Sequence, residues 1–340
     1  MRVATRPLHQ DGRRGSFGQV MEVLFGFLVG LVLLVIGGEL LVRGATSAAK
    51  ALGVSPLLIG LTLVGFGTST PELVTSVTAA LEGAPGIAVG NVVGSNLANI
   101  LLILGISALI FPMVVNPNGF KRDSIVLVAV TLAFVAIALY GRLDRLVGFG
   151  LVAALAGYIV FVYRQEKAHP EEPAAEVHQH MSDAARPGPK AISLSVGMAV
   201  VGIVVTILGA RFLVDAAVTT AQNLGIDDTI IGLTIVAVGT SLPELVTSVM
   251  AAIKKQADVA YGNIIGSNIY NILGILGVTA LIQPIDVPAQ IAQVDIWVML
   301  AATALLVFFA RSGFKLVRWE GGAFLAAYVA YTAWLISVAT

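Results

Sequence analysis

The sequence contains no cysteine and few charged residues. The absence of cysteine among the 340 residues excludes a disulfide framework and a thiolate metal site. Charged residues make up 12% of the chain, against about 25% in soluble domains. Twenty acidic residues balance twenty basic ones, so nothing indicates a nucleic-acid partner. The phosphate-binding pattern GxxxxGK followed by Ser or Thr is also missing.

Hydrophobic residues, in contrast, make up 57% of the chain, and the mean hydropathy is +0.91. A membrane-spanning helix needs about 20 mostly apolar residues. By that rule the sequence predicts an all-α polytopic membrane protein with ten transmembrane helices. The predicted spans are 22–46, 56–81, 86–112, 123–140, 145–163, 191–221, 228–253, 258–283, 292–310 and 319–338.

Polar segments divide these spans into two blocks of five. Residues 1–20 are polar and Arg-rich, and are interpreted as an N-terminal tail, either disordered or an upstream extension before a start at Met21. Residues 21–163 form the first predicted five-helix repeat, and residues 191–340 the second. Between them, residues 164–190 are rich in Pro, Glu and His, which is typical of a solvated linker.

Each block contains one copy of a long internal repeat. Gly60 to Gly105 aligns with Gly232 to Gly277 at a constant offset of 172 residues, and 28 of the 46 aligned residues are identical. Such self-similarity defines the architecture before any local prediction. Because five spans is an odd number, the second block must enter the membrane from the opposite side. The repeats are therefore predicted to be inverted, an arrangement in which many secondary transporters place their site at the midplane.

The distribution of Lys and Arg predicts the orientation, because cytoplasmic loops carry the excess of these residues. With the N-terminus outside, thirteen of them fall in inner loops and six in the outer loop and tail. We therefore expect a multi-pass protein of the cell inner (plasma) membrane, with both termini outside and the linker 164–190 in the cytoplasm. The lipid bilayer is its expected surrounding, and no required protein partner is evident.

Each repeat places a glutamate in an uncharged apolar segment, Glu72 in GTSTPEL and Glu244 in GTSLPEL. An acid at membrane depth indicates a functional site by default. Thr68 lies four residues before Glu72, on the same helix face, and Thr240 has the same relation to Glu244. A proline lies two residues after the serine of each GTS triplet. We therefore expect the preceding turn to open, the helices to break there, and freed carbonyl groups, such as that of Gly67, to turn toward the interior.

The next predicted helix adds further oxygen ligands, which both copies share. They are Ser95, Asn96 and Asn99 in the first copy and Ser267, Asn268 and Asn271 in the second. Ligation by oxygen alone favours a hard cation such as Ca²⁺. Two ionised glutamates would balance one divalent ion. An empty pair would repel and so favour protons or monovalent cations instead, and this competition is a physical basis for exchange.

The first helix of each block shows a weaker similarity at the same offset. The offset of 172 aligns Glu39 with Arg211 and Arg43 with Asp215, so each helix carries an acid and a base four residues apart with the signs exchanged. Such pairs share a helix face and neutralise each other. We interpret both pairs as structural.

On these residues the chain resembles the cation/calcium exchanger superfamily, and most closely the prokaryotic sodium/calcium exchangers. GTSTPEL and GTSLPEL, with GNVVGSNLANI and GNIIGSNIYNI, match the two α-repeats of that family, and the resemblance covers nearly the whole chain. It implies two inverted five-helix units and alternating access, with the first and sixth helices sliding past a fixed core. It also implies exchange of several Na⁺ for one Ca²⁺, with no ATP or redox cofactor.

The resemblance also implies a ligand set. Glu72, Glu244, Thr68 and Thr240 would coordinate Ca²⁺. Flanking Na⁺ sites would use the carbonyls of Gly65 and Ala237, the hydroxyls of Ser69, Ser241, Ser95 and Ser267, and the two glutamates. Asn99 and Asn271 match the remaining central positions. Some prokaryotic relatives have an aspartate at the second of these positions, and potassium-dependent relatives also use acids in this region. Asparagine at both positions therefore argues against dependence on K⁺.

Three other functions are compatible with parts of the pattern. A proton-coupled cation exchanger could use the same glutamate pair, although extra hydroxyl ligands such as Ser95 and Ser267 favour Na⁺. An intramembrane hydrolase could use Glu72 and Glu244 as acid and base, but no peptide-binding element is evident, so we expect no enzyme. A passive channel is less suited to two broken helices, which favour an occluded site.

Overall fold

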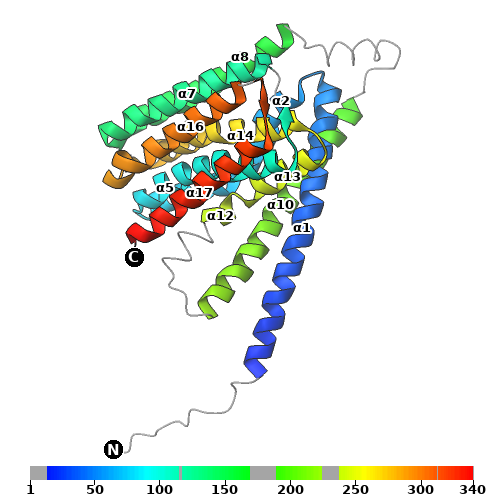
Figure 1. The fold of residues 1–340 in the computed structure, drawn as a ribbon, viewed down its shortest axis with the longest axis vertical. Coiled ribbons are helices and arrows are strands. Elements are labelled where there is room, and N and C mark those ends of the chain that lie inside the picture. The colour runs from blue at the N-terminus through cyan, green and yellow to red at the C-terminus, as the bar shows by residue number, and fades with distance from the viewer. Residues whose placement is uncertain (1–13, 115–116, 169–188, 224–236, 312, 340) are drawn as a thin grey trace, which may run out of the picture.

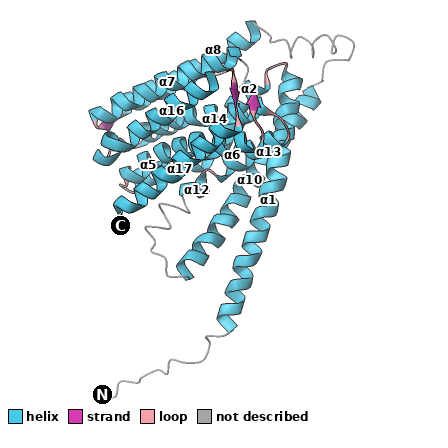
Figure 2. Ribbon diagram, in the orientation of Figure 1, coloured by secondary structure: helices cyan, strands magenta, loops and turns pink. Residues whose placement is uncertain are grey.

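A computed structural model describes residues 14–114, 117–168, 189–223, 237–311 and 313–339. This part of the chain is mostly helical, with a few very short strands between helices (Figure 2). Seven of its helices are long and apolar enough to cross a membrane, or eight if the bent pair Pro56–Thr68 and Thr70–Leu81 counts as one span. The predicted all-α membrane class is therefore confirmed at this level.

The first half of the chain runs from a long N-terminal helix to the helix before the linker. Its helices are α1 (Arg14–Leu52), α2 (Pro56–Ile59), η1 (Gly60–Val64), α3 (Gly65–Thr68), α4 (Thr70–Leu81), α5 (Pro85–Leu97), η2 (Ala98–Ile103), α6 (Leu104–Ile110), α7 (Pro117–Tyr140) and α8 (Arg145–Ala168). Its strands are β1 (Met113–Val114) and β2 (Arg142–Leu143).

The second half repeats this order as far as it is described. Its helices are α10 (Pro189–Asn223), α12 (Ala237–Thr240), α13 (Leu242–Ile253), α14 (Ala257–Tyr270), η4 (Asn271–Leu276), α15 (Gly277–Ile282), η5 (Ile291–Asp295), α16 (Ile296–Arg311) and α17 (Arg318–Ala339). Its strands are β3 (Ile285–Asp286) and β4 (Lys315–Leu316). Residues 228–236 of the predicted seventh span lie outside the described residues.

Several helices are longer than the predicted spans. Helix α1 begins at Arg14, inside the predicted tail, and α7 begins at Pro117 rather than at 123. Helix α8 continues to Ala168 and α10 begins at Pro189, so both ends of the expected linker 164–190 are helical. The reason is that a hydropathy window detects only the apolar part of a helix, whereas the backbone hydrogen bonds continue through polar residues at its ends.

Helices α1 and α10 run side by side at the edge of the remaining bundle (Figure 1). Glycines at seven-residue spacing line their interface: Gly30, Gly37 and Gly44 on α1, and Gly202 and Gly209 on α10. A Cβ atom at Gly37 would lie 2.5 Å from the backbone nitrogen of Thr206. Small residues at such interfaces let two membrane helices approach backbone to backbone. The two helices therefore form one closely packed unit.

The helices that follow the glutamate segments form the centre of the bundle. In the most apolar stretch of Pro85–Ile110, 72% of the residues are buried, and in that of Ala257–Ile282 the share is 83%. The corresponding shares for α1 and α10 are only 22% and 17%. The third helix of each half is thus surrounded by protein, while α1 and α10 are mostly open to the surroundings.

The two halves exchange equivalent contacts. Helix α6 packs on α17, and α8 packs on α15. Strand β1 pairs with β4, and β2 pairs with β3, both antiparallel. The offset of 172 carries α6 approximately onto α15 and Met113 of β1 onto Ile285 of β3. Each contact therefore has a counterpart in which the two halves have changed places.

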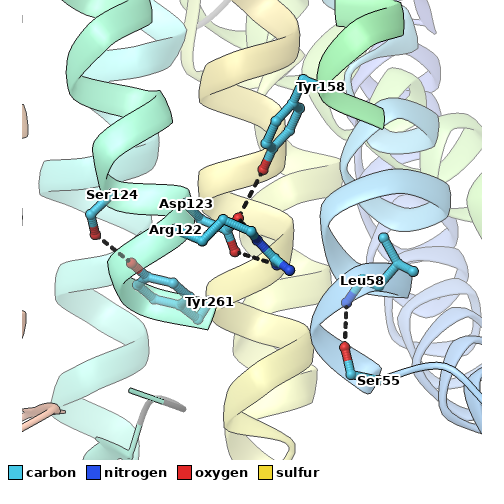
Figure 3. A network of polar contacts seen from close by, with 7 residues as sticks. All are labelled: Ser55, Leu58, Arg122, Asp123, Ser124, Tyr158 and Tyr261. Carbon is cyan, nitrogen blue, oxygen red and sulfur yellow. Dashed lines mark hydrogen bonds and ion pairs between the residues drawn. The ribbon is translucent and has the colours of Figure 1, made fainter. Parts of the chain in front are cut away.

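A buried polar network ties α7 to its neighbours (Figure 3). Asp123 is fully buried, forms an ion pair with Arg122 and accepts a hydrogen bond of 3.1 Å from the hydroxyl of Tyr158 on α8. The second half repeats the contact, because Tyr331 on α17 donates to Asp295 at 2.9 Å. These buried carboxylates are hydrogen-bonded, as burial of an acid requires, and they hold the α7–α8 and α16–α17 hairpins together.

Candidate functional site

The glutamate helices break in the turn before the proline, at a serine. Helix α3 ends at Thr68 and α4 begins at Thr70, with a bend of 44° between the two segments. Ser69 between them has φ −81° and ψ 12°, and its counterpart Ser241 has φ −89° and ψ 8°. Proline disfavours helical conformation in the preceding residues, which accounts for a break before Pro71 and Pro243.

The carbonyl of Gly67 has a hydrogen-bond partner, contrary to expectation. Because Pro71 has no N–H, this carbonyl was predicted to be free and to face the interior. Instead it accepts a hydrogen bond of 2.9 Å from the hydroxyl of Thr70. A threonine side chain often bonds to a carbonyl three or four residues earlier, and here it replaces the missing backbone donor.

Glu72 and Glu244 each have 1% of their surface exposed. Ser69 donates to Glu244 Oε1 at 2.7 Å, and Ser241 donates to Glu72 Oε1 at 3.1 Å. The serine of each repeat therefore binds the glutamate of the other repeat. These two crossed hydrogen bonds bring both broken helices to one place in the centre of the bundle.

Other predicted ligands lie around the same crossing. The hydroxyl oxygen of Ser241 also lies 3.3 Å from Ser95 Oγ, and Ser267 donates to the carbonyl of Gly65 at 3.1 Å. The buried hydroxyl of Thr68 donates to the carbonyl of Val64 at 3.0 Å. The structure thus brings oxygen atoms of α3, α4, α13, α5 and α14 together around the two glutamates.

The asparagines lie on π-helical turns that the sequence pattern does not reveal. Asn99 is the second residue of η2, and Asn271 is the first residue of η4. Asn271 donates to Asn96 Oδ1 at 2.9 Å, across the two halves. A π-helical turn changes the register of the residues after it, so the four-residue spacing of Ser95 and Asn99 does not by itself define a common face.

Two predicted ligands of the second half lie on the short helix α12. Ala237 is the first residue of α12, and Thr240 is its last and is half-buried. Helix α12 packs against α10, α13 and α5. This position is equivalent to that of α3 in the first half.

Four buried oxygen atoms of the site have no hydrogen-bond partner within the protein: Oε2 of Glu72, Oε2 of Glu244, Oδ1 of Asn99 and Oδ1 of Asn271. Among the described residues, no Lys or Arg forms an ion pair with either glutamate. The crossed serine hydrogen bonds bring the two carboxylates to the same buried crossing, where like charges repel. Unsatisfied buried acceptors and unpaired buried acids are costly. The donor set therefore favours occupation by cations or protons.

Two asparagines outside the predicted ligand set hold the glutamate helices in place. Asn91 donates to the carbonyl of Glu72 at 3.0 Å and to Ser76 Oγ at 2.9 Å. Asn263 makes the same pair of bonds to the carbonyl of Glu244, at 3.3 Å, and to Ser248 Oγ, at 2.9 Å. A signal was available, because both copies carry an amide at the same position of an otherwise apolar helix.

Replacing Asn91 or Asn263 with aspartate, which has the same shape but lacks the N–H₂ donors, is expected to weaken cation binding by about 10- to 100-fold, the usual cost of losing a residue that orients a ligand. Calorimetric titration of the purified variants with Ca²⁺ measures the effect. Ser193→Ala, at an exposed serine that bonds only within its own helix, serves as the control. An affinity equal to the unmodified protein in both variants would show that these amides do not position the glutamates.

The chain is similar to known proteins over most of its length. The family model described as "Sodium/calcium exchanger protein" matches residues 22–164 and 194–337. The protein CaxA of Alkalimonas amylolytica is 41% identical over 317 residues, which are 91% of this chain and 97% of that protein. The sodium/calcium exchanger MaX1 of Methanosarcina acetivorans is 37% identical, covering 89% and 95%. A solved structure of the sodium-calcium exchanger NCX_Mj aligns with a TM-score of 0.81 at 33% identity, covering 92% and 99%.

Proposed function

Because the chain belongs to the sodium/calcium exchanger protein family, we propose that it is a secondary active antiporter that exchanges Na⁺ for Ca²⁺ across the membrane. The observation that carries this proposal is the set of four buried, unpartnered oxygen atoms, two of which belong to glutamates that no described Lys or Arg neutralises. Oxygen donors of this kind suit Ca²⁺ and Na⁺. The family is one of transporters, and no enzymatic role is proposed.

In this proposal Glu72 and Glu244 neutralise one Ca²⁺, and the other predicted ligands complete its shell or hold Na⁺. The crossed serines support this assignment. Ser69 and Ser241 each lie within hydrogen-bond distance of a glutamate oxygen, so a cation held by one carboxylate is next to a hydroxyl of the opposite repeat. When Ca²⁺ leaves, repulsion between the carboxylates favours the entry of Na⁺. Competition for the same oxygens then couples the two fluxes.

The proposed architecture is ten transmembrane helices in two inverted five-helix repeats. The exchanged contacts between halves support it, since β1 pairs with β4 where β3 pairs with β2. Transport would proceed by alternating access, with α1 and α10 moving together past the core. Their close glycine interface supports motion as one body. Both termini would lie outside the cell inner membrane and the linker inside, as the Lys and Arg distribution indicates.

Sodium is favoured over protons as the coupling ion. A proton needs only the carboxylates, whereas the hydroxyls of Ser95 and Ser267 contact the site as well. The family match and the likeness to a sodium-calcium exchanger structure support the same choice. A proton-coupled exchanger would use Glu72 and Glu244 alone.

Equilibrium competition tests this choice. Purified protein in detergent is titrated with Ca²⁺ at fixed pH, with increasing NaCl replaced in parallel by choline chloride at equal ionic strength. We expect Na⁺ to weaken the apparent Ca²⁺ affinity and choline to leave it unchanged, because Na⁺ competes for the same oxygens. Ca²⁺ binding that ignores Na⁺ but weakens as the pH is lowered would instead support the proton-coupled alternative.

A further inference from the structure

An ion pair joins the α1–α10 unit to the core at the end of the molecule where the linker begins. Lys254, directly after α13, donates to Glu39 Oε1 on α1 at 2.7 Å. Arg43, one turn further along α1, pairs with the same carboxylate. The side chains of Glu39 and Lys254 are 29% and 25% exposed. The contact is thus partly shielded and links two elements that alternating access would move relative to each other.

The repeat contains a second, charge-exchanged version of this pair. The offset of 172 carries Glu39 onto Arg211 of α10 and Glu82, directly after α4, onto Lys254. Each half therefore offers one acid and one base at equivalent positions. The acid is on the long helix in the first pair and after the glutamate helix in the second. In the structure, Arg211 and Glu82 are both exposed, and neither forms an ion pair with any described residue. The Arg211–Asp215 pair expected from the sequence is likewise not formed among these residues.

Packing shows the same asymmetry independently of charge. At Gly38, α1 lies so close to α13 that a Cβ atom would be 2.9 Å from Val246 and 3.0 Å from Met250. The equivalent residues on α4, Val74 and Thr78, are exposed, Val74 to 53%. Helix α1 is therefore closed onto α13, whereas α10 does not cover α4. One contact is made and its symmetry-related counterpart is open.

We propose that these two pairs are alternating latches: Glu39–Lys254 holds the linker end closed, and Arg211–Glu82 forms when the opposite end closes. This inference rests on the proposed alternating access. Because α1 and α10 are packed backbone to backbone at their glycines, a shift that separates Glu39 from Lys254 carries Arg211 along. Each pair then stabilises one of the two end states, and the reversed signs prevent Glu39 from binding Glu82 or Arg211 from binding Lys254.

The absence of cysteine gives a direct readout. Leu81→Cys and Phe212→Cys introduce spin labels at two exposed positions next to Glu82 and Arg211. Double electron–electron resonance in lipid nanodiscs then measures the distance between α4 and α10. We expect a long distance to dominate, and Glu39→Gln or Lys254→Gln to raise the short-distance population about three- to fivefold, the range expected for a partly exposed ion pair. Arg211→Gln should lower that population.

Two variants make the test specific to the pairing. Reversing the charges with Glu39→Lys and Lys254→Glu, together with Arg43→Gln so that the new lysine does not meet a second cation one turn away, should restore the original distance distribution. Asp286→Asn removes an exposed ion pair with Arg142 away from α1 and α10 and should change nothing. The proposal is overturned if Glu39→Gln and Lys254→Gln match Asp286→Asn, or if charge reversal does not restore the distribution. The distances do not depend on which ion is carried, so a failure of Na⁺/Ca²⁺ exchange would be recognised separately by the flux of the unmodified protein.

Discussion

Replacing Glu72 or Glu244 with glutamine is expected to reduce Ca²⁺ transport at least about 100-fold, equivalent to about 2.7 kcal/mol. In the proposed site, each substitution removes one of the two negative charges that balance the divalent ion, and the described residues supply no other acid there. The amide oxygen can still accept the bond from Ser241 or Ser69. We therefore expect the fold to be kept, and ⁴⁵Ca²⁺ uptake into proteoliposomes to measure the loss.

Glu320→Gln provides the matched control. Glu320 is also buried, but its carboxylate accepts the backbone N–H of Val317 at 2.8 Å and lies outside the site. This variant should retain transport. If Glu72→Gln and Glu244→Gln fold and carry Ca²⁺ as fast as Glu320→Gln, the glutamates do not form the transport site.

The second large effect is expected at the α1–α10 interface. A Cβ atom at Gly202 would lie 2.3 Å from the backbone nitrogen of Leu41, so the valine of Gly202→Val must push the helices apart. Overpacking of this kind costs about 1–3 kcal/mol. We expect a lower melting temperature and, since the proposed mechanism moves α1 and α10 as one unit, transport slowed at least about tenfold. Fluorescence-detected melting and ⁴⁵Ca²⁺ uptake measure the two effects.

Gly197→Val tests whether the effect belongs to the interface. Gly197 lies on the same helix, and a Cβ atom there would meet no described atom within 4 Å. This variant carries the same propensity cost and should transport like the unmodified protein. Equal transport by both variants would contradict the view that close approach at Gly202 couples the two helices.

The repeat made the candidate site partly predictable from sequence. Two copies of the same motif, each with an acid in an apolar segment, were enough to select Glu72 and Glu244, and burial of both is confirmed. The partner of each glutamate was not predictable from spacing. Ser69 and Glu244 are 175 residues apart, and only the packing of the two halves brings them together.

Other features lay outside what residue patterns encode. The π-helical turns at Asn99 and Asn271 arise from backbone hydrogen bonds, and hydropathy and four-residue spacing do not distinguish them from α-helix. The spacing of Glu39 and Arg43 predicts a pair within one helix. It carries no information about Lys254, which lies directly after a different helix and donates to the same carboxylate. Helix ends were missed for a similar reason, since polar residues extend α1 and α7 beyond their apolar stretches.

The most direct test of the proposed exchange is ⁴⁵Ca²⁺ uptake into proteoliposomes loaded with Na⁺. They are diluted in parallel into Na⁺-free medium and into medium with equal Na⁺, with the pH clamped on both sides. Na⁺/Ca²⁺ exchange predicts uptake only when the Na⁺ gradient is directed outward. Uptake that ignores the Na⁺ gradient and follows an imposed pH gradient would contradict it, and would assign the coupling to protons carried by Glu72 and Glu244.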